Sequence, residues 1–152
     1  MGIYRVRLRN DFPNRTDENC WQTSEFDLGY NCLGWAAFAD KVLMSPEPDA
    51  FWPDCPPNMK LDSVVCAFAT VGFSPCLTSE LEDGIEKVAL YLTNGIVEHA
   101  ARQETDGTWS SKVGLEEDVA HNTLDALAGG RYGTEFKFLC RPRGQAPNAP
   151  PT

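Results

Sequence analysis

The sequence predicts an α+β fold in which helices come first and an antiparallel sheet follows. Residues 31–43 are apolar for most of their length, and residues 61–69 place apolar side chains at helical spacing. From residue 87 onward, runs of strand-forming residues flank the turn pairs Asn94-Gly95 and Asp106-Gly107. Helices followed by hairpin-connected strands are typical of the α+β class.

The N-terminal part of the chain contains the predicted helices. Alternation over residues 3–8 predicts a short strand before them. The helix over residues 31–43 has Cys32 in its first turn and ends before two prolines. Residues 51–57 contain three prolines and predict a loop, and the second helix, over residues 61–69, ends near a glycine.

The predicted sheet occupies the C-terminal half of the chain. Its strands are residues 87–92, 96–103, 108–113 and 134–140, and a short helix capped by Thr123 is predicted over 124–128. The acidic stretch 77–86 before the first of these strands is predicted to be a solvated loop.

Length and composition indicate a single domain over residues 1–140 and a proline-rich, extended tail over 141–152. The chain has 13 Lys and Arg against 22 Asp and Glu, a net charge of −9. This balance argues against nucleic-acid partners and against docking on an anionic membrane. No apolar run approaches the ~20 residues of a membrane span.

The number and spacing of the cysteines indicate the cellular compartment and whether a metal site is expected. There are six, without a C-x-x-C pair, and neither histidine lies near them at zinc-ligand spacing, so no metal site is predicted. The N-terminus lacks the features of a signal peptide, which favours reduced cysteines and a cytoplasmic protein. No organic cofactor is predicted.

One pair of residues is a candidate for chemistry: Cys32 and His99. A helix N-terminus lowers the pKa of a thiol, and a nearby imidazole can accept its proton. With Asn94-Gly95 as a two-residue turn, Leu90 pairs with His99. This register predicts that His99 lies on the apolar face of the sheet, which the Cys32 helix covers.

A third polar residue is predicted on the next strand. If the apolar side chains of that strand share the face of His99, Ser111 is best placed to orient the imidazole, and Lys112 is the alternative. Asn31 is predicted either to stabilise an oxyanion or to cap the helix. A buried cysteine and a lone histidine on an apolar face also fit purely structural roles, and His121 is expected to pack near the short helix.

The segment Asn-Cys-Leu-Gly-Trp-Ala-Ala at 31–37 resembles the nucleophile segment of CHAP and NlpC/P60 enzymes, which are papain-like cysteine peptidases and amidases. That resemblance implies a papain-like layout with N-terminal helices packed on an antiparallel sheet. Asp-Gly-Thr-Trp-Ser-Ser-Lys-Val-Gly at 106–114, with similar stretches over residues 26–142, also resembles a group of bacterial proteins of no known activity.

The expected function is therefore cysteine-dependent hydrolysis of an amide or acyl bond in a protein or peptide substrate, by a peptidase, amidase or deamidase that acts as a toxin-like effector. Cys32 is the expected nucleophile, His99 the base and then the acid, and Ser111 the orienting residue. The alternative is a non-enzymatic acidic binding protein, such as an immunity or inhibitor protein, that covers a basic partner.

Overall fold

The computed structural model describes residues 12–23, 29–38, 42–113 and 118–144, so the strand predicted over residues 3–8 lies outside the described residues. The helices are α2 (Cys32–Phe38), α3 (Leu61–Ala69) and the 3₁₀ turn η1 (Leu124–Leu127). The strands are β1 (Cys20–Gln22), β2 (Ser74–Cys76), β3 (Ile85–Thr93), β4 (Ile96–Gln103), β5 (Trp109–Lys112), β6 (Asp118–His121) and β7 (Glu135–Pro142).

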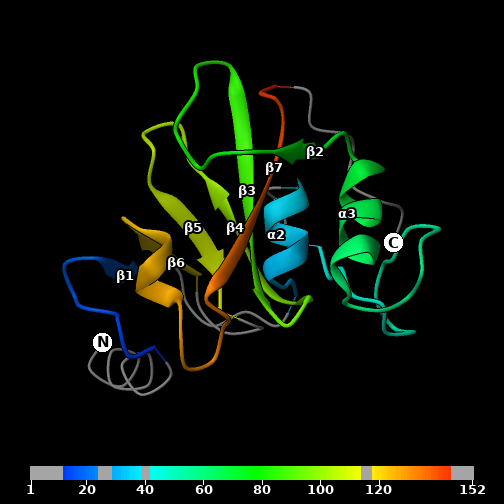
Figure 1. Ribbon diagram of the computed structural model, residues 1–152, viewed down its shortest axis with the longest axis horizontal. Coiled ribbons are helices and arrows are strands. Elements are labelled where there is room, and N and C mark those ends of the chain that lie inside the picture. The colour runs from blue at the N-terminus through cyan, green and yellow to red at the C-terminus, as the bar shows by residue number, and fades with distance from the viewer. Residues whose placement is uncertain (1–11, 24–28, 39–41, 114–117, 145–152) are drawn as a thin grey trace.

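The strands form one antiparallel sheet in the order β1-β6-β5-β4-β3-β7-β2 (Figure 1). The long strands β3, β4 and β7 make its centre, and the short strands β1 and β2 are its edges. Helices α2 and α3 pack on one face. The η1 turn lies on the other, where the Tyr91 hydroxyl on β3 donates to the Leu124 carbonyl.

The predicted fold class, a papain-like α+β arrangement of N-terminal helices packed on a sheet, is wrong. The described chain is mostly a seven-stranded antiparallel sheet, and α2 and α3 contain only seven and nine residues. Of the helix predicted over 31–43, the described helical part ends at Phe38. Val42 has already turned back, because its carbonyl accepts from the Asn31 N–H.

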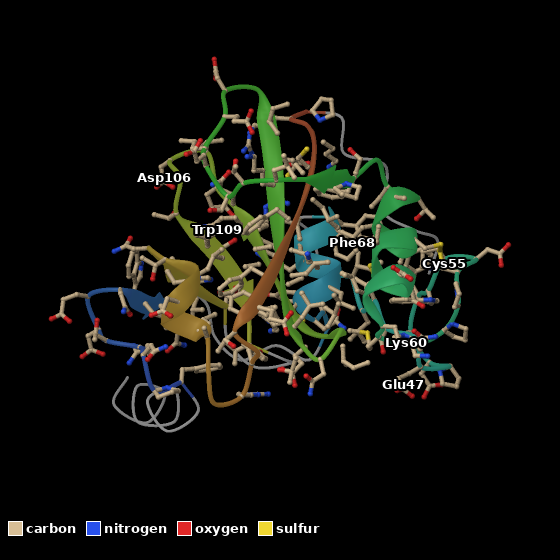
Figure 2. The ribbon with its side chains drawn as sticks, viewed as in Figure 1. Glu47, Cys55, Lys60, Phe68, Asp106 and Trp109 are labelled. Atoms are coloured by element: carbon tan, nitrogen blue, oxygen red, sulfur yellow. A yellow bond between two sulfur atoms is a disulfide. The ribbon has the colours of Figure 1, made fainter. Side chains whose placement is uncertain are left out.

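Two separate cores lie on the two faces of the sheet. The first fills the space between the helices and the sheet, and includes Phe68, which lies on the side of α3 turned toward α2 (Figure 2). The second lies on the opposite face and includes Tyr91, Trp109 and Tyr132. Residues that alternate along the central strands therefore enter different cores.

The predicted hairpin at Asn94-Gly95 is confirmed. Asn94 has φ 51° and Gly95 φ 79°, the left-handed conformations that a tight two-residue hairpin turn requires. The predicted register beyond the turn is wrong, because Leu92 pairs with Val97 but Tyr91, not Leu90, pairs with His99. Glu98 is thus an extra residue, a β-bulge, and it turns His99 to the face opposite α2.

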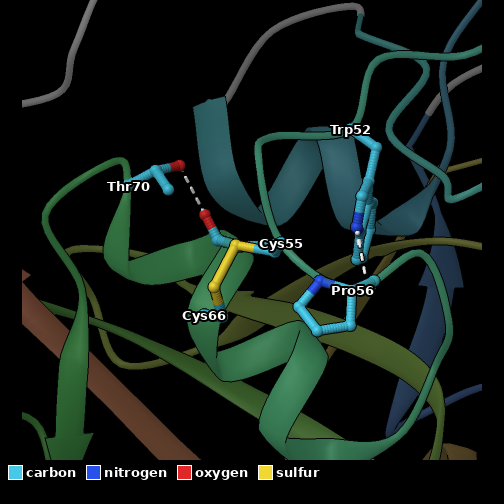
Figure 3. Close-up of a disulfide and its surroundings, with 6 residues drawn as sticks. Trp52, Cys55, Pro56, Cys66 and Thr70 are labelled. Carbon is cyan, nitrogen blue, oxygen red and sulfur yellow. Dashed lines mark hydrogen bonds between the residues drawn. A yellow bond between two sulfur atoms is a disulfide. The ribbon is translucent and has the colours of Figure 1, made fainter.

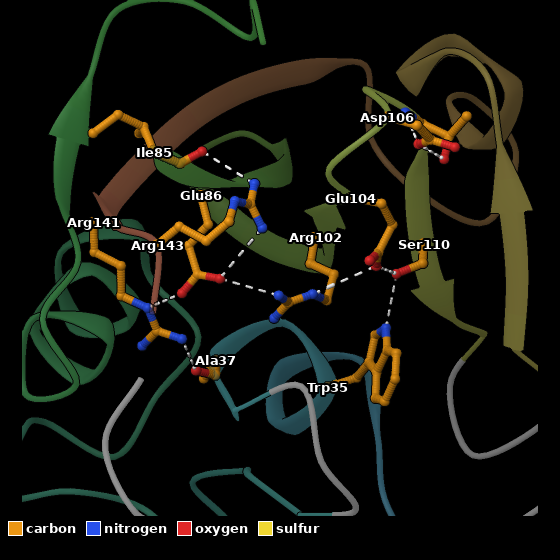
Figure 4. A network of polar contacts seen from close by, with 11 residues as sticks. Trp35, Ala37, Ile85, Glu86, Arg102, Glu104, Asp106, Ser110, Arg141 and Arg143 are labelled. Atoms are coloured by element: carbon orange, nitrogen blue, oxygen red, sulfur yellow. Dashed lines mark hydrogen bonds and ion pairs between the residues drawn. The ribbon is translucent and has the colours of Figure 1, made fainter. Parts of the chain in front are cut away.

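A buried ion-pair network joins β3, β4 and β7 to the end of α2 (Figure 4). The Glu86 carboxylate accepts from Arg102 at 3.1 Å and from Arg141. Arg141 also donates to the Ala37 carbonyl at 2.9 Å, which satisfies the C-terminal turn of α2. Strand β7 continues through Arg141 to Pro142, two residues beyond the predicted domain end at residue 140.

A disulfide joins Cys55, in the predicted proline-rich loop, to Cys66 on α3 (Figure 3). The prediction that all cysteines are reduced is wrong for this pair, whereas Cys20, Cys32, Cys76 and Cys140 are free. In the part of the chain that the structure describes, both α-helices are too short to cross a membrane.

Candidate functional site

Cys32 is the first residue of α2, and Asn31 fixes this end of the helix. The Asn31 Oδ1 accepts from the Gly34 N–H at 3.0 Å, which is a helix cap. The same amide also bridges to Met44, accepting from its N–H and donating to its carbonyl. Of the two roles predicted for Asn31, the hydrogen bonds give the cap.

Cys32 is half-buried, and desolvation of its thiol raises the pKa of this group. The backbone N–H groups of Ala100, Leu33 and Cys32 itself act in the opposite direction, as does the charge of Arg131, but desolvation is the larger effect. The N–H groups at the helix N-terminus lower the pKa of this thiol in the predicted direction, but desolvation outweighs them and the net shift is upward. Cys32 is a protonated thiol at neutral pH.

His99 is fully buried on the other face of the sheet. Its ring stacks on Tyr132 with centroids 4.1 Å apart and meets the edge of Tyr91 at 5.2 Å. Desolvation, with the nearby His121 and the charge of Arg131, lowers the pKa of His99 well below its usual range. The imidazole is neutral at neutral pH.

Ser111 contacts His99 as the sequence predicted. Its Oγ lies 2.9 Å from His99 Nε2 and 2.8 Å from His121 Nε2, and His121 Nδ1 lies 2.8 Å from the Thr123 carbonyl. His121 packs beside the short η1 turn, as expected, and also completes this network. Burial lowers the pKa of His121 to about 4, so it too is neutral.

The network fixes the tautomer of each histidine. A carbonyl only accepts, so His121 Nδ1 carries the proton and donates to Thr123. His121 Nε2 then accepts from the Ser111 hydroxyl, which is left to accept from the Nε2–H of His99. The Nδ1 of His99 consequently holds a bare lone pair. It is buried and has no hydrogen-bond partner.

Lys112, the alternative to Ser111, points to the face that α2 covers. It is fully buried, with Nζ 4.0 Å from the centroid of the Tyr30 ring. The Tyr30 hydroxyl in turn donates to Asp118 at 2.6 Å. Lys112 thus belongs to a cluster beside the start of α2, whereas Ser111 is the residue that contacts His99.

Cys32 and His99 lie close along the backbone but on different faces of the sheet. The Ala100 N–H contacts the Cys32 sulfur, and Ala100 is the residue after His99. Strand β5 pairs with β4 only at Arg102 and Gln103, so the strands are not paired at this level. Among the described hydrogen bonds none joins Cys32 to His99.

Sequence reasoning missed the contributions of His121, Arg131 and Tyr132 to this site. His121 lies in a four-residue strand, too short for a periodic signal. Tyr132 follows a tight turn after the pair Gly129-Gly130, both of which have positive φ. That glycine pair was the available signal, because it places the next two residues in a fixed turn.

The site offers a thiol and a base held by a polar network. Within the described ranges, no three His, Cys, Asp or Glu side chains gather as metal ligands.

Comparison with known proteins gives a family. Neither the curated proteins nor the solved structures contain a match to this chain. Residues 21–140 match one family, described as a domain of unknown function, DUF7689. Because this match covers more than half of the chain, including Cys32, His99, Ser111 and His121, the protein is a member of the DUF7689 family.

Proposed function

We propose that the protein is a cysteine-dependent acyl hydrolase in which Cys32 is the nucleophile and His99 the base. One observation carries this proposal: the His99 Nδ1 is a buried lone pair whose tautomer Ser111 and His121 fix. An unpartnered buried nitrogen costs stability, and such a cost is commonly retained at functional sites.

The proposed reaction is acyl transfer through a thioester. The Cys32 thiol attacks the carbonyl carbon as its proton passes to His99 Nδ1, and the imidazolium then protonates the leaving amine or alcohol. Water, deprotonated by His99, hydrolyses the thioester to a carboxylic acid and restores the thiol. We propose the Cys32 N–H as oxyanion donor.

The directions of the pKa shifts favour a general-base reaction. The raised pKa of Cys32 and the lowered pKa of His99 favour a neutral thiol and a neutral imidazole over a resting ion pair. Proton transfer therefore accompanies attack. The two groups lie on different faces of the sheet, so the proposed reaction requires the substrate to reach both of them beside the stretch where β4 and β5 are not paired. Ser111 acts as a positioning residue.

The substrate class that we propose is a protein or peptide, and the direct test is acylation by a simple activated ester. With p-nitrophenyl acetate, the protein should release a burst of one nitrophenolate per chain and carry an acetyl group on Cys32, located by peptide mass spectrometry. Cys32→Ala should abolish the burst. His99→Ala should slow both formation and loss of the acetyl group.

Adjacent serines supply a matched control. Ser110 lies on the face opposite Ser111, where it accepts from the Trp35 indole at 3.0 Å and donates to Glu104 (Figure 4). Ser111→Ala should slow acetylation by roughly 10²-fold, the scale of losing one general-base arrangement. Ser110→Ala should not. Equal nitrophenolate release by the wild type and Cys32→Ala would refute the proposal.

A second candidate is a binding protein for a basic partner, which the acidic segment before β3 favours. Leu77 is 95% exposed and Leu81 50% exposed, and they lie among Glu80, Glu82 and Asp83. Exposed apolar side chains ringed by carboxylates suit a basic, partly apolar surface. Without the acetylation burst, binding to an immobilised peptide of lysine and leucine that is weakened in Leu77→Ser would support this alternative.

A further inference from the structure

Two of the free cysteines, Cys76 and Cys140, lie on neighbouring strands at one edge of the sheet. Strand β2 carries Cys76 and pairs with β7, which carries Cys140 (Figure 1). In the register of these strands, Ser74 is opposite Cys140 and Cys76 is opposite Phe138. Side chains two residues apart on a strand share a face, so Cys76 and Cys140 are diagonal neighbours on the same face of the sheet.

The thiols of these two cysteines also interact. The pKa of Cys76 is raised to about 11, first by desolvation and then by a hydrogen bond with Cys140 and the charge of Cys140. One side chain acts on another through a hydrogen bond only at short range, so the register and this interaction agree on the proximity of the two sulfur atoms. Both cysteines are half-buried, which leaves them open to a small reagent.

A lysine shares the face on which the two thiols lie. Lys87 on β3 is opposite Cys140, and its Nζ donates to the Thr78 carbonyl at 2.9 Å. The Cys76 thiol lies 3.9 Å from that same carbonyl oxygen. The ammonium charge acts against the upward shift in the pKa of Cys76 and thus favours the thiolate, which is the form that attacks a disulfide.

We infer that Cys76 and Cys140 form a reversible disulfide, a modification site that fastens the edge strand β2 to β7. The reaction is thiol–disulfide exchange with a small disulfide such as oxidised glutathione. One cysteine thiolate attacks the small disulfide, forms a mixed disulfide and releases one glutathione. The thiolate of the other cysteine then attacks the mixed disulfide and releases the second glutathione. Two protein thiols are oxidised, the small disulfide is reduced, and the two protons pass to the released glutathione thiols.

The position of Cys76 on the edge strand suits this bond. A disulfide requires Cα atoms within about 7 Å of each other, and diagonal neighbours in a sheet lie near this limit. Cys76 is the last residue of the three-residue strand β2, which has a partner strand on one side only in the described sheet. The end of β2 can therefore move toward β7 without breaking the pairing of another strand. The resulting loop contains β3 to β6, and closing so long a loop restricts the unfolded chain.

Exposure of the folded protein to oxidised glutathione at about pH 8.5 tests the inference, with free thiols then blocked and the peptides analysed without reduction. The expected product is monomeric protein in which the peptides of Cys76 and Cys140 are joined, with no glutathione attached. The midpoint of thermal unfolding should rise by roughly 10 °C, the scale of one bridge across a long loop in a chain of this size. An excess of reduced glutathione should separate the two peptides again.

Single variants of the pair supply the controls. Cys76→Ser and Cys140→Ser should each stop at a mixed disulfide between glutathione and the remaining cysteine, without the rise in the unfolding midpoint. Cys32→Ala removes the proposed nucleophile and should form the bridge like the wild type, so the inference does not depend on the hydrolase. Folded wild-type protein that retains glutathione on both cysteines, or in which both remain unmodified, overturns the inference. A bridged protein that unfolds at a lower temperature than the unbridged one also overturns it, because β2 would not be fastened.

Discussion

The two histidines of the site are neutral because they are buried, and this couples their chemistry to the stability of the fold. An imidazole that is held away from water resists protonation, whereas the same imidazole in the unfolded chain takes up a proton near pH 6.5. His121 is held in its neutral form by hydrogen bonds to the Thr123 carbonyl and the Ser111 hydroxyl. The proposed base is therefore available throughout the neutral range, and acid should unfold the protein before it protonates the site.

The first prediction concerns that acid sensitivity. The folded pKa of His121 is about 4, below its unfolded value. The contribution of this residue to the free energy of unfolding is therefore complete above pH 6.5 and is lost as the pH falls toward 4. Integrated over that interval, His121 accounts for about 3 kcal/mol of unfolding free energy. His99, whose pKa is also lowered, acts in the same direction.

Urea unfolding from pH 7.5 to pH 4.5 measures this effect. His121→Gln should be less stable than the wild type at pH 7.5 but should lose less stability on acidification, because one proton-uptake site is gone. The carboxylates titrate alike in both proteins, so their effect on the free energy of unfolding cancels when the two proteins are compared. Parallel stability curves for the wild type and His121→Gln would show that His121 is not the acid-sensitive group.

The short helix α2 is held at its two ends by side chains from elsewhere in the chain. Asn31 caps the first turn and binds Met44, and Arg141 of β7 binds the carbonyl of Ala37. Seven residues are too few for a helix to be stable alone. Its position, and with it that of Cys32, depends on the chain that turns back over it at Val42.

The second prediction tests that close contact through Gly34. In an ordinary helix, replacing glycine by alanine stabilises by about 1 kcal/mol. At Gly34 a Cβ would overlap the carbonyl oxygen and carbon of Val42, which are backbone atoms and cannot rotate away. We therefore expect Gly34→Ala to be destabilising, by about 2 kcal/mol or more, within the range for overpacked sites.

Thermal unfolding of Gly34→Ala checks the sign of this effect. A helix position without such a contact is the control: Ala36→Gly in the same helix should be destabilising by the usual cost of glycine and of a lost core methyl group. If Gly34→Ala raised the melting temperature, the contact between α2 and Val42 would be wrong, and the placement of Cys32 would need revision.

The elements also show where sequence reasoning succeeds. The turn at Asn94-Gly95 was predictable because its conformation depends on the two residues in it. The bulge at Glu98 was not, because nothing in the adjacent residues marks an extra position in β4. Because of that single residue, His99 lies on the face opposite to the predicted one. The predicted contact between His99 and Ser111 is nevertheless present.

For the whole molecule, the predicted parts are those whose signals are local and long enough to repeat. The four strands predicted between residues 87 and 140 and the helix over 61–69 are present. The strands β1, β2 and β6 have three or four residues each, and β1 and β2 are held by distant partners, as in the pairing of Cys20 with His121. Such pairings have no periodic signal of their own. The papain-like layout failed for the same reason, because these short strands extend the sheet to seven.

The disulfide could not be predicted either, because six cysteines allow fifteen complete pairings and the sequence does not indicate which two cysteines form a bond. Its position shows what it does. Cys55 lies in the loop before α3, where the Trp52 indole donates to the Pro56 carbonyl at 3.1 Å, and Cys66 lies on the helix (Figure 3). The bridge fastens a segment without regular secondary structure to the apolar core on which α2 also packs.

The last prediction follows from that position. The bridge closes a loop with a sequence separation of 11, so its removal should lower the free energy of unfolding by about 3 kcal/mol through the added entropy of the unfolded chain. The double variant Cys55→Ser/Cys66→Ser tests this in urea, with Cys76→Ser/Cys140→Ser as the matched control that removes two thiols and no bridge. The first variant should be less stable than the wild type, and the control should be close to the wild type in stability.

Neither variant removes a group of the proposed site, so the folded protein should still become acetylated at Cys32 by p-nitrophenyl acetate. If the first variant were as stable as the control, Cys55 and Cys66 would not be joined in the native protein, and the loop before α3 would be held by its apolar contacts alone.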